Sequence, residues 1–251
     1  MKSERETTKK VHPSGRLRRI YKTLSTVLAI ASIGYLLLLT FPQALFAYTI
    51  EQGKFRVYSR EPLTPEIDKV LDDAESRLRT SPLYDVEVSR RIYLTNSFSM
   101  YALLSHKAYM SFGNSVPFIS NVFINKADVI NDRVFMNRVE HNSRSLSGVI
   151  AHEVTHLFIR NRFGTLKTSF VTPTWKNEGY CEYVAGESTI PLDEGIRLWR
   201  ANPLDDTGYR YTKYHLMVKY LLENEHLSVD ELFTRSLDEK EVAEKTFESF
   251  Q

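Results

Sequence analysis

The stretch SRSLSGVIAHEVTHLFIRNRFG, residues 143–164, decides the fold and most of the chemistry of this chain. It predicts a helix over residues 143–163, because apolar residues recur at helical spacing and Gly164 is a typical residue to follow a helix. His152 and His156 are four residues apart, so they lie one turn apart on one face of that helix. Two imidazoles in this arrangement can bind one metal ion.

Glu153, directly after the first of these histidines, adds an acid beside the same face. At about 100° per residue it lies between the histidines and the apolar stripe that enters the core, so the three polar groups can line a cleft. A carboxylate in that place can take a proton from a metal-bound water. The alternative is a chance match on a solvated helix, which arises in about one or two chains per hundred of this size.

A metal site of this kind needs a third ligand, and the sequence offers one on a second helix. Arg162 stands where a metzincin has its third histidine, so that class is ruled out. Residues 173–185 predict the second helix, in which Glu178 lies 22 residues after His156. Glu182, one turn later on the same face, can accept the second ring N–H of a metal-binding histidine. The alternative is an acidic helix face exposed to solvent.

HEVTH followed by WKNEGYCEY resembles the gluzincin zinc metallopeptidases, of the thermolysin and aminopeptidase N type. The likeness is greatest to bacterial proteins of the peptidase MA-like group, whose second helix reads roughly W-x-x-E-G-x-x-E-Y. The resemblance covers residues 145–186, extends weakly to residues 211–222 and does not cover residues 1–120. The residues that match the second helix are Trp175, Glu178, Gly179, Glu182 and Tyr183.

The resemblance implies a zincin-like domain, in which a twisted sheet packs on the HEVTH helix, and one bound Zn²⁺ ion. The residue roles that it implies are zinc ligands for His152, His156 and Glu178, catalytic base for Glu153, and partner of a zinc-binding histidine for Glu182.

Peptide hydrolysis also needs a hydrogen-bond donor for the oxygen that becomes negative in the transition state. The resemblance implies a Tyr or His downstream, and Tyr211 fits the family's pattern best. Three residues of the same region remain alternatives: Tyr209, Tyr214 and His215. The competing interpretation is that these aromatic residues pack a helix against the core.

Residues 24–46, LSTVLAIASIGYLLLLTFPQALF, carry no charge over 23 positions. At about 1.5 Å per residue they can cross a hydrocarbon core of about 30 Å. Basic residues precede them, so the positive-inside rule predicts a cytoplasmic tail at 1–23 and an extracytoplasmic domain at 47–251, periplasmic if the source is a Gram-negative bacterium. A cleaved signal peptide is the rival interpretation, but the apolar run is longer than such peptides usually have.

Charge and cysteine content exclude some classes of function. The net charge is +2, residues 1–22 alone carry +6 and residues 23–46 carry none, so residues 47–251 carry −4. A nucleic-acid partner for the folded part is therefore not expected. The single cysteine, Cys181, excludes an internal disulfide and a cysteine-based zinc site, and we expect it to point into the core behind Glu178.

The other elements predict an α+β domain, because strands are followed by helices. Strands are predicted at residues 54–60 and 89–96, and two more within 121–137 that join at a turn at Asn131-Asp132. Helices are predicted at residues 64–79, at 173–185 and over most of the chain from about residue 208. Residues 99–118 are ambiguous, and residues 121–125 or 133–137 are the candidates for an edge strand that pairs with an extended substrate.

These observations predict a zinc peptidase that is anchored in the lipid bilayer by its N-terminal helix and hydrolyses a peptide or protein substrate. One alternative is a catalytically inactive zincin-like domain that binds a component of the cell envelope. Another is a membrane-tethered scaffold without a metal. The presence of Glu153 favours catalysis, because a purely structural metal site needs no such acid.

Overall fold

The computed structural model describes residues 15–105, 110–136 and 143–250. The chain divides into two compact units, residues 1–42 and residues 43–251. The first 14 residues of the predicted cytoplasmic tail lie outside the described residues.

The first unit contains one long apolar helix, α1 (Gly15–Thr40). By length and composition, its segment Arg18–Thr40 can cross a membrane, and it is the one such helix among the described residues. Its 23 residues span about 35 Å, more than the hydrocarbon core of about 30 Å. The helix ends before the predicted anchor does, because Pro42 cannot continue it and opens a short 3-10 turn, η1 (Pro42–Leu45).

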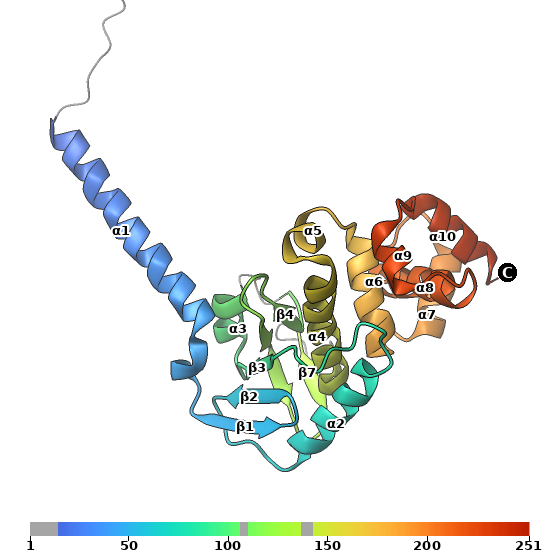
Figure 1. Ribbon diagram of the computed structural model, residues 1–251, viewed down its shortest axis with the longest axis horizontal. Coiled ribbons are helices and arrows are strands. Elements are labelled where there is room, and N and C mark those ends of the chain that lie inside the picture. Colours follow the sequence, from blue (N-terminus) through green and yellow to red (C-terminus); the bar gives the residue numbers. More distant parts are fainter. Residues whose placement is uncertain (1–14, 106–109, 137–142, 251) are drawn as a thin grey trace, which may run out of the picture. The chain divides into compact units, whose positions relative to one another are not determined.

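A five-stranded mixed sheet lies at one side of the second unit (Figure 1). In spatial order its strands are β1 (Tyr48–Gln52), β2 (Phe55–Ser59), β3 (Arg90–Leu94), β5 (Asn121–Ile124) and β4 (Gly113–Ser115). The three central strands run parallel, and the two edge strands run antiparallel to their neighbours. Three strands, β6 (Lys126–Asp128), β7 (Arg133–Phe135) and β8 (Ser143–Ser145), form a separate antiparallel sheet.

The strands agree in part with the sequence prediction. Those at 54–60 and 89–96 are confirmed as β2 and β3, but β1 was missed because most of its residues are exposed and only Ile50 packs on the core. The segment 121–137 holds three strands rather than two, since Asn125 separates β5 from β6 and the two belong to different sheets. The predicted turn is confirmed between β6 and β7, where Asp132 has a φ of 49°.

Helix α4 (Leu146–Phe163) is the central helix of this unit. It starts three residues later than predicted, because residues 143–145 pair with β7 and the Ser145 hydroxyl accepts the Gly148 N–H at 3.0 Å as the helix cap. Every residue from Leu146 to Ile159 is buried, because four elements pack against α4. They are the strands β4 and β5 and the helices α2 (Glu66–Leu78) and α6 (Thr174–Ala185). Gly164 ends the helix at a φ of 87°.

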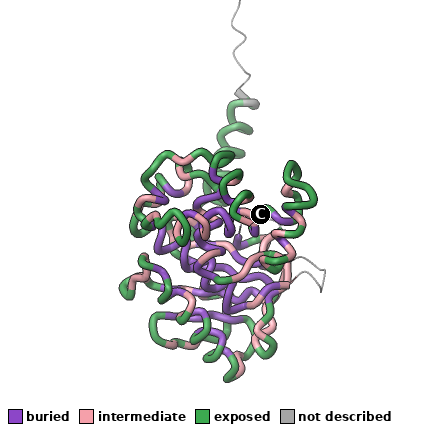
Figure 2. The backbone as a smooth tube through the Cα atoms, turned by 90° about the vertical axis from the view of Figure 1, so that its right-hand side faces the viewer, coloured by how far each residue is buried: buried purple, intermediate pink, exposed green. Residues whose placement is uncertain are grey.

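Helices surround α4 on the side away from the sheet (Figure 1). Those not yet named are α5 (Thr165–Phe170), α7 (Leu192–Ala201), α8 (Arg210–Glu223), α9 (Val229–Thr234) and α10 (Glu239–Glu248). The short helix α3 (Phe98–Ser105) lies elsewhere, against β4 and β5. The helices predicted at 64–79, at 173–185 and beyond residue 208 are confirmed, and so is the α+β class. Figure 2 shows the buried residues gathered in the interior of this unit, where α4 and the central strands lie.

Candidate metal-binding site

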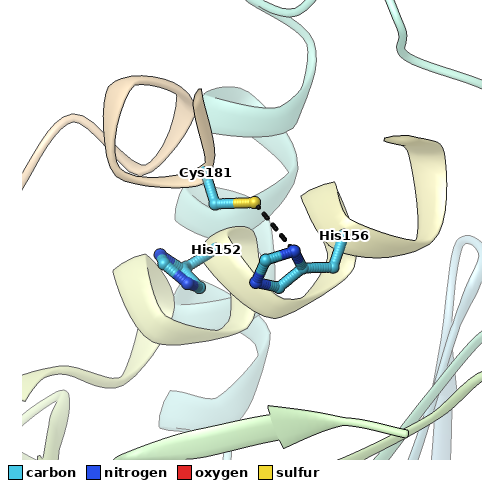
Figure 3. Close-up of side chains that lie close together, drawn as sticks. All are labelled: His152, His156 and Cys181. Atoms are coloured by element: carbon cyan, nitrogen blue, oxygen red, sulfur yellow. Dashed lines mark hydrogen bonds between the residues drawn. The ribbon is translucent and has the colours of Figure 1, made fainter. Parts of the chain in front are cut away.

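His152 and His156 lie side by side on α4 (Figure 3). Their ring centroids are 5.1 Å apart, and the residues are 7% and 9% exposed. The four-residue spacing places both rings on one face of the helix, as the sequence predicts. Because the sheet and neighbouring helices pack against several sides of α4, the backbone that carries both rings is held in place.

Glu178 on α6 contacts both rings through one carboxylate oxygen. Its Oε2 atom lies 3.3 Å from Nε2 of His152 and 3.7 Å from Nε2 of His156. The adjacent Gly179 allows this placement, because a Cβ there would lie 2.5 Å from the backbone oxygen of Tyr214 and would push α6 away from α8. Burial acts to raise the pKa of Glu178, but attraction to His156 and His152 outweighs it and holds that pKa well below its ordinary value.

Glu182, one turn further along α6, is fully buried between Arg144 and His152. Its Oε1 atom lies 2.8 Å from Nη1 of Arg144 and 3.0 Å from Nδ1 of His152. The contact with His152 is within ion-pair distance but does not have the alignment of a hydrogen bond. Burial acts to raise the pKa of Glu182, but Arg144 and His152 lower it to about 2. Glu182 is therefore a carboxylate at neutral pH.

Arg144, which belongs to no motif in the sequence, completes this network from β8. Its Nε atom also lies 3.3 Å from Oε1 of Glu187, so two carboxylates compensate one buried guanidinium. The Ser145 hydroxyl donates to the other oxygen of Glu187 at 2.8 Å. An arginine 38 residues before its partner has no periodic spacing that could have revealed the pair.

Glu153 turns from α4 toward the edge strand β4. Its Oε2 atom accepts the Ser115 N–H at 2.7 Å, and Gly113 allows the approach, because a Cβ there would lie 2.8 Å from Cγ of Glu153. Arg160 of α4 donates to the Ser115 backbone oxygen at 2.9 Å. The outward N–H and C=O of Ser115 are thus both bonded to side chains of α4.

The predicted positions of the edge strand, 121–125 and 133–137, are wrong. The strands that form there, β5 and β7, each pair with a strand on both sides. The edge strand beside Glu153 is β4, with three residues, in the stretch that Gly113, Asn114 and Pro117 made ambiguous. A strand so short has no alternation that could identify it.

Cys181 of α6 is fully buried and faces His156. Its Sγ atom lies 3.3 Å from Nδ1 of that histidine (Figure 3), so it points toward the histidine pair rather than only into the core behind Glu178 as expected. The possible ligand atoms of His152, His156 and Cys181 all lie within 4.8 Å of one another, a group that can hold a metal ion. The exclusion of a site with cysteine was therefore too strong, because one thiol can join two histidines.

The site opens into a cavity of about 580 Å³, which Tyr211 lines from the start of α8. Tyr211 is 43% exposed, and burial together with the charges of Glu178, Glu182 and Glu153 raises its pKa to about 12. The phenol therefore keeps its proton at neutral pH and can donate a hydrogen bond.

The other three candidates for the donor do not line this cavity. Tyr209 donates its hydroxyl to the backbone oxygen of Asn202 at 2.6 Å. Tyr214 and His215 are buried in the packing of α8. The structure thus brings His152, His156, Glu178, Glu182, Glu153 and Tyr211 around one cavity.

Comparison with known proteins does not assign this site to a family. No protein-family model matches the chain, and no curated protein matches it in sequence.

Proposed function

We propose that this chain is a membrane-anchored zinc peptidase with a zincin-like domain. The observation that carries the proposal is the convergence of His152, His156 and Glu178. Zinc binds imidazole nitrogen and carboxylate oxygen at about 2.0–2.2 Å, and the corners of a tetrahedron of that size are about 3.4 Å apart. Separations of 3.3 and 3.7 Å between Oε2 of Glu178 and the two Nε2 atoms fit that edge length.

The partners of the other ring nitrogens support the same assignment. Nδ1 of His152 lies beside Glu182, and Nδ1 of His156 lies beside the sulfur of Cys181. In metal-binding histidines, the nitrogen that does not bind the metal commonly contacts a carboxylate or another acceptor, which orients the ring. Nε2 of each ring is then left for the ion.

A ligand set of His152, His156 and Cys181 has less support. Cys181 lies on the Nδ1 side of His156, whereas Glu178 lies on the Nε2 side. Burial and the charges of Glu178 and the neighbouring acids raise the pKa of the thiol well above its ordinary value. Zinc binds the thiolate, whereas in the metal-free protein this sulfur is a protonated thiol.

The remaining residues suit the hydrolysis of a peptide bond. A bound zinc ion would supply Lewis acidity, which polarises a scissile carbonyl and makes a water molecule more acidic. Glu153 takes a proton from the attacking water and returns it to the leaving amine. The Ser115 N–H orients the Glu153 carboxylate, and the Tyr211 hydroxyl donates a hydrogen bond to the carbonyl oxygen as it becomes negative.

The membrane anchor in this proposal is α1. Its apolar segment is long enough to span the bilayer, and basic residues stand at its N-terminal end: Arg16, Arg18, Arg19 and Lys22. Positive charge next to a spanning helix favours the cytoplasmic side, so the domain from residue 47 onward would lie outside the cytoplasm.

The test is the metal content and peptidase activity of the full-length chain in detergent, beside Glu178→Ala and Glu153→Gln. We expect about one zinc ion per chain in the wild type and in Glu153→Gln, and little in Glu178→Ala. With an unfolded protein as substrate, Glu153→Gln should lower the rate by about 10²–10⁴-fold. A wild-type chain without zinc contradicts the proposal. A wild-type chain that binds zinc but does not hydrolyse the substrate indicates the inactive binding domain instead.

A further inference from the structure

Arg160 places a half-buried cation in the wall of the same cavity. It lies four residues after His156 and therefore one turn further along the same face of α4. Its Nη2 atom donates to the backbone oxygen and the hydroxyl of Ser115 at 2.9 and 3.0 Å. Its Nη1 atom is buried and has no hydrogen-bond partner among the described residues.

The other arginines that line the cavity are compensated by acids, and Arg160 is not. Arg144 pairs with Glu182 and with a second carboxylate, and Arg210 lies 3.0 Å from Asp206. Within the part of the chain that the structure describes, no carboxylate lies within ion-pair distance of Arg160. Its bonds to Ser115 fix the edge strand but leave its charge without a counterion.

An uncompensated guanidinium at this depth is costly. Burial lowers the pKa of Arg160, although the more distant charges of Glu153 and Glu178 act to raise it. A carboxylate that enters the cavity would offset this cost, because charge-assisted bonds from arginine to carboxylate are among the strong hydrogen bonds in proteins.

We propose that Arg160 binds a carboxylate of the substrate, supplied either by the C-terminus of a peptide or by an acidic side chain. The reaction rests on the proposed zinc peptidase, but the binding of the carboxylate does not. One helical turn is about 5.4 Å, and extended peptide spans about 3.3–3.6 Å per residue. A C-terminal carboxylate at Arg160 would therefore bring one of the last two peptide bonds to His152 and His156.

The experiment measures binding to the full-length chain in detergent and EDTA, so that no metal can attract the carboxylate. The probes are acetyl-Ala-Leu with a free C-terminus, its C-terminal amide, and the amides of acetyl-Ala-Glu and acetyl-Ala-Gln, and their affinities are measured by ligand-observed NMR. In the wild type we expect the free acid, the glutamyl amide or both to bind at least about tenfold more tightly than the matched neutral peptide. The preferred probe identifies the source of the carboxylate.

The variants are Arg160→Gln and Arg160→Lys, with Arg162→Gln as the matched control. Arg162 lies two residues away and pairs with the exposed Asp230. We expect the preference to disappear in Arg160→Gln, to persist in part in Arg160→Lys and to be unchanged in Arg162→Gln, while circular dichroism checks that each variant is folded. Equal binding of charged and neutral peptides by the wild type overturns the proposal, as does an unchanged preference in Arg160→Gln. Zinc content of the same preparations, measured without EDTA, reports separately on the proposed function.

Discussion

The cavity has two sides whose polar groups are satisfied to different degrees. On the side that we propose to bind the metal, here called the ligand side and formed by α6 and the histidine pair of α4, Glu182 is fully buried and contacts Arg144 and His152, and Glu178 contacts both histidines. On the side that we propose to meet the substrate, here called the substrate side and formed by β4, Arg160 and the start of α8, Tyr211 is 43% exposed and Nη1 of Arg160 has no hydrogen-bond partner among the described residues. Groups that hold an ion must be fixed before it arrives, whereas groups that meet a substrate must stay available to it.

Beyond the losses expected for Glu178→Ala and Glu153→Gln, the largest effect should come from the substrate side, with Tyr211→Phe. If the phenol stabilises the negative oxygen, its loss should lower kcat by about 10²–10³-fold, the usual cost of removing one such donor. The zinc content should change little because Tyr211 is not part of the ligand side. KM should change little because the phenol's hydrogen bond strengthens only in the transition state. Steady-state kinetics and metal analysis of the same preparation measure both quantities.

Tyr214→Phe is the matched control for this variant. Tyr214 lies three residues later on α8, with its ring centroid 6.4 Å from that of Tyr211, but it does not line the cavity. We expect it to keep kcat within about threefold, as for a substitution away from the reacting atoms. A loss in Tyr214→Phe that equals the loss in Tyr211→Phe would remove Tyr211 from its proposed role.

The difference between the two sides also explains what the sequence could predict. His152 and His156 share a helix at a spacing that specifies their direction, and Glu178 and Glu182 share another, so each pair is visible in the sequence alone. That the two pairs meet depends on the packing of α6 against α4, which here agrees with the expectation.

The substrate side could not be predicted in the same way. Strand β4 has three residues and depends on pairing with β5, which is a tertiary contact without a local pattern. Arg160 belongs to the quoted helix, but its lack of an acidic partner depends on residues that fold around it from elsewhere. The sequence predicted the inner strands of the sheet, which are apolar because they are buried. It did not predict the two edge strands, β1 and β4, because their residues do not form an apolar pattern.

A buried histidine behind the ligand side should make stability depend on pH. Burial lowers the pKa of His215 to about 4, although Glu182 acts to raise it, and its Nδ1 atom has no hydrogen-bond partner among the described residues. In the unfolded chain the pKa of this histidine is about 6.5, so between pH 6.5 and 4 the unfolded chain takes up a proton that the folded chain does not. The free energy of unfolding should therefore fall over this range, by up to about 3 kcal/mol.

Urea denaturation of the full-length chain in EDTA between pH 7.5 and 4 measures this dependence. His215→Gln should be less stable than the wild type at pH 7.5 but should show a shallower fall with pH. His226→Gln, at an exposed position in the turn after α8, should keep the wild-type dependence. Parallel curves for the wild type and His215→Gln would show that other groups cause the fall.

A smaller effect should follow from Glu182→Gln on the ligand side. The variant removes the charge beside Nδ1 of His152 and one of the two acids that compensate Arg144. Loss of such a partner lowers metal affinity by about 10–100-fold, which competition with a chelator measures. Glu187→Gln is the control, since Glu187 also pairs with Arg144, and we expect its zinc affinity to change much less. Equal losses in both variants would assign the effect to Arg144 rather than to His152.

The smallest effect should come from Cys181→Ser, and it decides which atoms form the ligand side. If His152, His156 and Glu178 bind the ion, the sulfur only contacts Nδ1 of His156, and a hydroxyl in its place should keep zinc affinity within about tenfold of the wild type. If Cys181 is a ligand, the variant should lose the ion as fully as Glu178→Ala is expected to. Cobalt gives an independent readout, because a bond from thiolate to Co²⁺ produces an intense near-ultraviolet absorption that nitrogen and oxygen ligands do not. Its absence from the wild-type spectrum, with the visible bands of bound Co²⁺ present, would exclude the thiol as a ligand, and loss of the bound ion in Glu178→Ala would then assign the third ligand to the carboxylate.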